Sequence, residues 1–148
     1  HPELITNAAE AFGSQSIVAS IDAKKTKNGY QCVINDGHEL TEKKPAELAK
    51  EAERLGAGEI IINSIDQDGT MQGYDIELVR SVADAVKIPV TAIGGAGGIQ
   101  DLKKVLDEGH AHAAAGGSMF VYYGRKKAVL ITFPSEKELI NNSIYESR

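Results

Sequence analysis

The sequence predicts an α/β protein built on a parallel sheet, and two observations lead to this prediction. Short apolar segments recur along the 148-residue chain and alternate with segments of helical periodicity. Each apolar segment ends abruptly in a carboxylate or a glycine-rich turn, and ligands of α/β folds bind where parallel strands end. We therefore expect strands near residues 16–22, 59–64, 89–94 and 112–116, forming a parallel sheet in that order.

The segments between these strands predict helices and one hairpin. Residues 3–12 place Leu4, Ala8 and Phe12 four apart, with Gly13 as the stop signal. Residues 26–37 are polar and carry turn signals, so we expect a small hairpin inserted after the first strand. Further helices are expected at 41–54, from 74–75 to 86, and at 100–108.

The carboxyl-terminal segment follows a different pattern. A short helical turn is expected at 116–120, a strand-like run at 128–133 stops at Pro134, and 135–141 has helical composition. The chain is thus one helix followed by four strand–helix units, all in a single domain covering residues 1–148. Four such units form half of an eight-stranded barrel, or else a flavodoxin-like layered sheet.

Composition excludes several classes of function. A formal net charge of −5 argues against nucleic-acid binding by bulk electrostatics. Cys32 is the single cysteine, which excludes a disulfide framework and suits a reducing cytoplasm. We expect no membrane span, because no apolar run approaches the ~20 residues that one needs. The chain begins at His1 without a methionine, which suggests a fragment of a longer protein.

Carboxylates follow the first two predicted strands. Asp22 comes directly after the first strand, and Asp66 and Asp68 follow the second. Turn formation alone explains an Asp-x-Asp-Gly sequence, and Asp22 could simply cap a turn or pair with a lysine. Because the carboxyl ends of barrel strands carry catalytic groups, Asp22 and its neighbours are candidates for chemistry.

Glycine-rich turns follow the other two predicted strands. Gly94-Gly95-Ala96-Gly97-Gly98 directly precedes a helix, and Gly116-Gly117-Ser118 precedes a helical turn. Without side chains, backbone N–H groups can approach a ligand, and a helix N-terminus adds positive potential. The pair predicts a cup for a phosphate group, as the last two loops of a barrel form.

Other candidate sites are weaker. His110 and His112 alternate along a strand and so face opposite sides, which argues against a metal pair, and we expect no metal and no cofactor. No histidine lies near Ser64 in a pattern typical of a catalytic triad, so we do not expect Ser64 to act as a nucleophile. Glu59 lies at the amino end of its strand. Residues at that face of a barrel usually contribute to stability and not to catalysis.

Several motifs resemble the cyclase subunit of imidazole glycerol phosphate synthase. They include SIDAK at 20–24, SIDQDGT at 64–70, GYD at 73–75 and GGAG at 94–97. The resemblance covers about residues 1 to 120. That family forms a (βα)8 barrel of roughly 250 residues built from two similar halves. The resemblance therefore implies the C-terminal half of the barrel, strands five to eight, and favours the half barrel over the layered sheet.

The resemblance also implies roles for individual residues. Asp22 matches one of the two aspartates that act as general acid and base in the cyclisation. Glu59 matches one member of a charged gate through which ammonia enters from a partner glutaminase at the amino-terminal face of the barrel. The remaining matches bind the phosphorylated substrate: Asn63, Ser64 and Asp68 line the cleft, and Gly94, Gly95, Gly117 and Ser118 form a phosphate cup.

Two departures from the family pattern leave an alternative open. Asn63 stands where histidine-pathway enzymes usually carry threonine, and the tail at 117–134 is unlike their C-terminal helix. The tail is similar to a second branch, found with surface-polysaccharide genes, which is thought to deliver ammonia for sugar amidation. A phosphate-binding half barrel without turnover is the non-enzymatic alternative. Because strands one to four are absent, we expect closure by a missing N-terminal half or by a homodimer.

Overall fold

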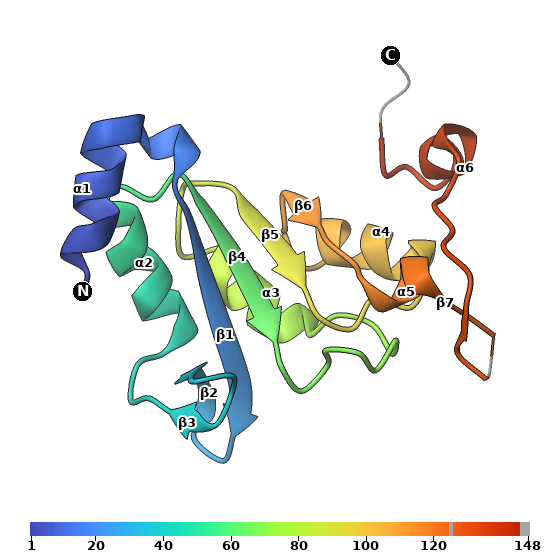
Figure 1. Ribbon diagram of the computed structural model, residues 1–148, viewed down its shortest axis with the longest axis horizontal. Coiled ribbons are helices and arrows are strands. Elements are labelled where there is room, and N and C mark those ends of the chain that lie inside the picture. The colour runs from blue at the N-terminus through green and yellow to red at the C-terminus, as the bar shows by residue number, and fades with distance from the viewer. Residues whose placement is uncertain (125, 146–148) are drawn as a thin grey trace.

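The computed structural model describes residues 1–124 and 126–145, and its centre is a six-stranded sheet (Figure 1). The strand order is β3-β2-β1-β4-β5-β6. Four of these strands run parallel, namely β1 (Val18–Thr26), β4 (Glu59–Ser64), β5 (Val90–Ile93) and β6 (Ala113–Ala114). The predicted parallel sheet and the order of its strands are therefore confirmed.

The helices lie close to their predicted positions. They are α1 (Glu3–Phe12), α2 (Pro45–Leu55), α3 (Ile76–Ala83), α4 (Ile99–Asp107), α5 (Ser118–Val121) and α6 (Glu136–Asn141), with a 3₁₀ turn at Ser14–Ser16. Helix α2 begins at Pro45 and not at Thr41, because proline has the backbone angle of a first helical turn and lacks an N–H to satisfy. Helix α3 begins after Asp75, whose side chain accepts the Leu78 N–H at 3.1 Å.

The predicted hairpin insert is wrong in one respect. β1 does not stop at Asp22 but continues to Thr26, and its second half pairs antiparallel with β2 (Gly29–Ile34). The hairpin is thus an extension of the first strand, closed by a turn at residues 27–28, and β3 (Glu39–Leu40) pairs with its outer edge. Asn28-Gly29 favours this tight turn, and Gly29 has a φ of +94°.

The helices of the described residues cover one face of the parallel sheet and leave the other uncovered, and Figure 1 views the sheet from the uncovered face. On the covered face Ile60 and Ile62 of β4 pack with Leu78 and Val82 of α3, all four fully buried. Successive residues of β4 alternate between buried and half-buried, so the strand is not buried on both faces as its apolar run predicts. The reason is that none of the described residues forms a layer over the second face.

The uncovered face presents side chains in layers set by the strand register. Ser20 of β1, Ile61 of β4 and Thr91 of β5 are aligned in one layer. Asp22 and Asn63 are aligned in the next layer toward the carboxyl ends. In a closed barrel such layers form the interior, so the open face is the half core of a barrel.

The carboxyl-terminal segment extends away from the sheet (Figure 1). β7 (Tyr122–Tyr123) pairs antiparallel with β8 (Ala128–Val129), and the predicted strand at 128–133 ends after two residues. Helix α6 follows, and its Leu139 is buried. None of the helices in residues 1–124 and 126–145 is long and apolar enough to span a membrane.

Candidate functional site

Asp22 and Asn63 form a hydrogen-bonded pair on the open face of the sheet. They are register partners on β1 and β4, and Asn63 Nδ2 donates to Asp22 Oδ1 at 3.0 Å. The described residues give Asp22 no other side-chain partner, so its second carboxylate oxygen can interact with a ligand on this face. Asn63 Oδ1 is buried and likewise lacks a partner there, which leaves an acceptor for a ligand N–H or O–H.

Asp66 has a structural role in the described fold. Its Oδ2 accepts the backbone N–H of Lys25 at 2.8 Å, which joins the loop after β4 to the end of β1. Lys25 Nζ also donates to Glu77 at 2.8 Å, and the pKa of Glu77 is lowered by this hydrogen bond and then by one from Tyr30. These contacts fix the β1–β2 hairpin to the beginning of α3.

A cavity of about 90 Å³ lies where the loops after β4, β5 and β6 meet. Its wall combines the predicted phosphate-binding glycines with Asp68, an exposed carboxylate. Within the described chain the N–H groups of Gly95, Gly117 and Ser118 donate to no other protein group. The lining residues are Asp68, Gly69, Ile93, Gly94, Gly95, Ala96, Gly116, Gly117 and Ser118.

The structure gives Gly94 and Gly95 a second reason to be glycine. A Cβ at Gly94 would lie 2.7 Å from Asn63 Oδ1 and from the Ser64 carbonyl oxygen. A Cβ at Gly95 would collide with the carbonyl oxygen of Gly73, and the Gly73 N–H donates to Gly95 O at 2.8 Å. The loop after β4 therefore packs backbone to backbone against the glycine loop. Contact with a ligand is not needed to explain these residues.

The N-terminus of α4 carries an acidic residue that the phosphate-site prediction did not include. Asp101 lies in the first turn of α4, and its Oδ2 accepts the N–H groups of Gly97 and Gly98 at 2.9 and 3.1 Å. These N–H groups are satisfied within the protein, and the carboxylate offsets the positive end of the helix. Asp101 stands three residues after Gly98, the usual spacing of a capping acid, so the sequence contained this signal.

Replacing Gly95 by alanine is expected to destabilise the protein by more than ~3 kcal/mol, because the Cβ meets backbone and the φ of +104° disfavours any side chain. The free energy of unfolding of the full-length protein measures this. Gly98→Ala is the matched control, because Gly98 has extended backbone and an open environment, so its cost is expected within ~1 kcal/mol. Equal stability of the two variants would contradict the backbone packing.

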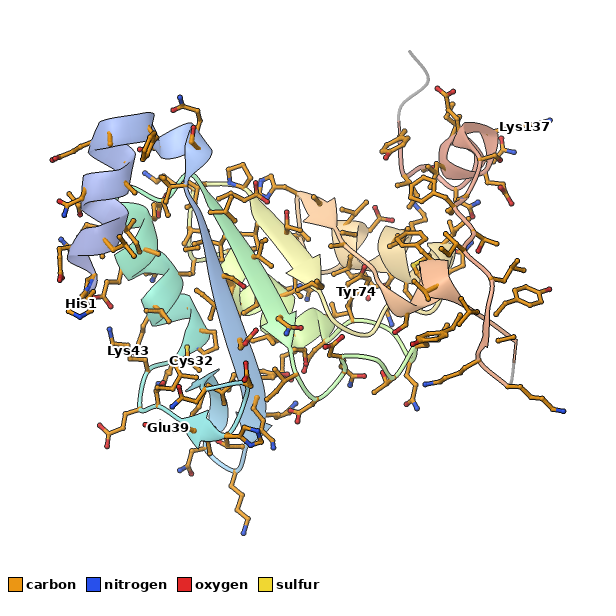
Figure 2. The ribbon with its side chains drawn as sticks, in the orientation of Figure 1. His1, Cys32, Glu39, Lys43, Tyr74 and Lys137 are labelled. Atoms are coloured by element: carbon orange, nitrogen blue, oxygen red, sulfur yellow. The ribbon has the colours of Figure 1, made fainter. Side chains whose placement is uncertain are left out.

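Tyr74 joins two segments close to the cavity, although it does not line the cavity itself. Its hydroxyl donates to the carbonyl oxygen of Ala115 at 2.7 Å, which ties the loop before α3 to the end of β6. Tyr74 is buried, and burial raises its pKa. Figure 2 labels it beside the carboxyl end of β5. In the sequence Tyr74 lies in the GYD motif at 73–75 and precedes a helix, and no role was predicted for its side chain.

The remaining predicted residues lie apart from the cavity. Ser64 is 3% exposed on the covered face, so its side chain is not beside Asn63 on the open face. Glu59 lies at the opposite end of β4, where its Oε1 accepts the Thr91 hydroxyl at 2.6 Å. Neither residue therefore shares the layer of Asp22.

The histidines have structural partners. His110 Nδ1 lies 2.7 Å from Asp84 Oδ1, and His112 Nδ1 accepts the Val90 N–H at 3.2 Å. No group of three or more His, Cys, Asp or Glu side chains that could hold a metal ion exists among the described residues. Cys32 is a buried free thiol, and burial raises its pKa to about 11.

Comparison with protein families gives one match that covers most of the chain. Residues 1–127 match the model of the family described as histidine biosynthesis protein. The match includes the strands of the parallel sheet, the Asp22–Asn63 pair and every loop that lines the cavity.

Similar proteins occur in several bacteria. A provisionally named imidazole glycerol phosphate synthase subunit HisF of Leptospira borgpetersenii is 45% identical over 137 residues, 91% of this chain and 54% of that protein. A subunit named hisF3 of Vibrio vulnificus is 42% identical over 93% of this chain and 54% of its own length. A subunit named hisF2 of Pseudomonas aeruginosa is 43% identical over 92% of this chain and 55% of its own length. The chain thus spans about half the length of the curated relatives it matches.

Proposed function

Because the chain belongs to the histidine biosynthesis protein family, we propose that it forms the carboxyl-terminal half of a cyclase barrel of the imidazole glycerol phosphate synthase type. The observation that carries the proposal is that Asp22 is aligned with Asn63, near the carboxyl end of β4, and that the loops after β4, β5 and β6 line the glycine-rich cavity. Residues 1–148 then constitute one partial (βα)8-barrel domain, and the missing strands are supplied by an N-terminal half or a second copy.

The proposed reaction is the ammonia-dependent cleavage and cyclisation of a phosphoribosyl-formimino aminoimidazole carboxamide nucleotide. Its products are imidazole glycerol phosphate and an aminoimidazole carboxamide nucleotide. Such a reaction needs a positioned acid and a positioned base, and Asp22 supplies one of them. The hydrogen bond from Asn63 Nδ2 orients its carboxylate toward the open face. The second carboxylate comes from the other half of the barrel.

The substrate is proposed to bind across the open face with one phosphate in the cavity. The N–H groups of Gly95, Gly117 and Ser118 and the Ser118 hydroxyl are suitable donors for phosphate oxygens, and Gly94 completes the wall. Asn63 Oδ1 and the Asp68 carboxylate are acceptors and suit substrate N–H or hydroxyl groups. Ser64 contributes through its backbone, because its side chain faces the helices.

Ammonia is proposed to enter at the amino-terminal face of the barrel from a glutaminase subunit. Glu59 lies at that end of β4 and carries a carboxylate on the open face, as a charged gate would require. The relatives are each named as a subunit, which supports an assembly of more than one chain. A cytoplasmic location is part of the proposal, since the single cysteine is a free thiol.

The two alternatives from the sequence have less support. Ammonia delivery for sugar amidation rests on Asn63 and on the tail, and the names of the relatives do not favour it over cyclisation. A phosphate-binding half barrel without turnover remains the outcome if the full-length protein binds phosphate but shows no ammonia-dependent product.

Phosphate binding tests the cavity directly. Inorganic phosphate and ribose 5-phosphate are expected to bind the full-length protein at millimolar concentration in isothermal titration, and no measurable heat would refute the cup. Ser118→Ala is expected to weaken binding by ~1 kcal/mol, because one hydroxyl donor is lost. Ser20→Ala is the matched control, since Ser20 is exposed on the same open face in a different layer. An equal loss in both variants would contradict a specific site.

A further inference from the structure

The phosphate cavity lacks a positive side chain in its wall. Among the described residues that line it, Asp68 is the only ionisable one, and its carboxylate repels an anion. The α4 N-terminus is offset by Asp101, which already accepts the Gly97 and Gly98 N–H groups. The net charge of −5 adds a weak repulsion over the whole molecule. A phosphate dianion bound there therefore needs a cation from a neighbouring segment.

Lys127 lies at the rim of this cavity. Its Nζ is 3.4 Å from the carbonyl oxygen of Gly69, and Gly69 is a lining residue next to Asp68. A neutral carbonyl at this distance is a weak partner for an ammonium group, whereas a phosphate oxygen is a strong one. The lysine stem is long and exposed, so the ammonium can turn from the carbonyl to a ligand in the cavity.

Backbone hydrogen bonds connect the segment that carries Lys127 to α5, the helix that begins at the cavity. Lys127 ends the turn between β7 and β8, where its N–H donates to Gly124 O at 3.0 Å. Beyond β8, Leu130 N–H donates to Val121 O and Thr132 N–H to Phe120 O, both at 2.9 Å. Val121 and Phe120 belong to α5, whose first residue, Ser118, lines the cavity. The β7–β8 turn is thus connected through α5 to the phosphate loop.

We propose that Lys127 is a binding residue of this site, supplying the cation that pairs with a phosphate group of the substrate. The proposal rests on the proposed function, because it concerns the same cavity, and it adds a role for the carboxyl-terminal tail. The ligand class is a phosphomonoester dianion held by loop N–H groups on one side and by the Lys127 ammonium on the other. The tail then acts as part of the active site and not only as the end of the chain.

The test compares two adjacent lysines of the same turn. Inorganic phosphate is titrated into the full-length protein and into its Lys127→Ala, Lys127→Arg and Lys126→Ala variants at low and moderate ionic strength. Lys127→Ala is expected to weaken binding roughly fivefold to tenfold, mostly at low ionic strength, because a charge-assisted contact is lost. Lys127→Arg keeps the charge, and its dissociation constant for phosphate is expected within roughly threefold of the parent value.

The control separates a local contact from general charge. Lys126→Ala removes the same charge from an exposed neighbouring position, and it is expected to change the dissociation constant less than twofold. If Lys127→Ala and Lys126→Ala weaken binding equally, or not at all, Lys127 is not a binding residue while the cavity remains a phosphate site. If the parent protein itself binds no phosphate, both the Lys127 role and the proposed cup are refuted.

Discussion

Asp22→Asn is expected to lower kcat of the full-length protein with ammonium salt by about 10² to 10⁴-fold, the usual contribution of a general acid or base. The change keeps the size and shape of the side chain, and an asparagine oxygen can still accept the 3.0 Å hydrogen bond from Asn63 Nδ2. The loss is therefore chemical and not structural. The unfolding midpoint should stay close to that of the parent, and product formation with ammonium salt measures the rate without a glutaminase.

Asp66→Asn is the matched control for this experiment. Asp66 follows β4 of the parallel sheet, and its Oδ2 accepts the Lys25 N–H at 2.8 Å, a role that an asparagine oxygen can take over. The rate of the Asp66→Asn variant is expected within roughly threefold of the parent rate, since the Lys25 N–H needs only a neutral acceptor. An Asp22→Asn variant that keeps more than a tenth of the parent rate would refute the role proposed for Asp22.

The 148-residue chain by itself is expected to turn over at least about a hundredfold more slowly than the complete barrel, a loss of ~3 kcal/mol in transition-state stabilisation. Catalysis needs both carboxylates and both phosphate anchors in register, and this chain supplies Asp22 and one cavity. The comparison uses the same ammonium-salt assay for both forms. Near-full activity of the isolated chain would show that the other half contributes little.

The same chain is expected to associate in solution. The open face leaves Val18 of β1 48% exposed and Ile61 half-buried, and β6 has an unpaired edge in the described sheet. Exposed apolar surface and an open edge both favour pairing with another sheet. Analytical ultracentrifugation should show a dimer, or a monomer only after the N-terminal half is added. A stable monodisperse monomer without a partner would contradict closure of the barrel.

Local pattern accounts for most of the fold. The alternation of apolar strands with amphipathic helices predicts the parallel sheet, and Gly13 marks a helix boundary because its backbone preference is local. The start of α2 at Pro45 follows from the same kind of preference, although the helix was expected to begin at Thr41. The error at the hairpin has a simple cause. The polar residues after Asp22 lack the apolar pattern of a strand, yet they extend β1 because β2 supplies the backbone partners.

The sequence by itself determined the family, the order of the elements and the strand ends at which the glycine loops occur, whereas the structure places Asp22 inside β1. Only the tertiary structure decided which of these residues meet. The backbone N–H of Lys25 donates to Asp66 across 41 positions, Lys127 Nζ donates to the Gly69 carbonyl oxygen across 58, and Gly95 is packed against Gly73 by a loop from another strand. The physical reason is that periodicity and turn preference act between near neighbours, whereas packing and charge pairing depend on distance in space.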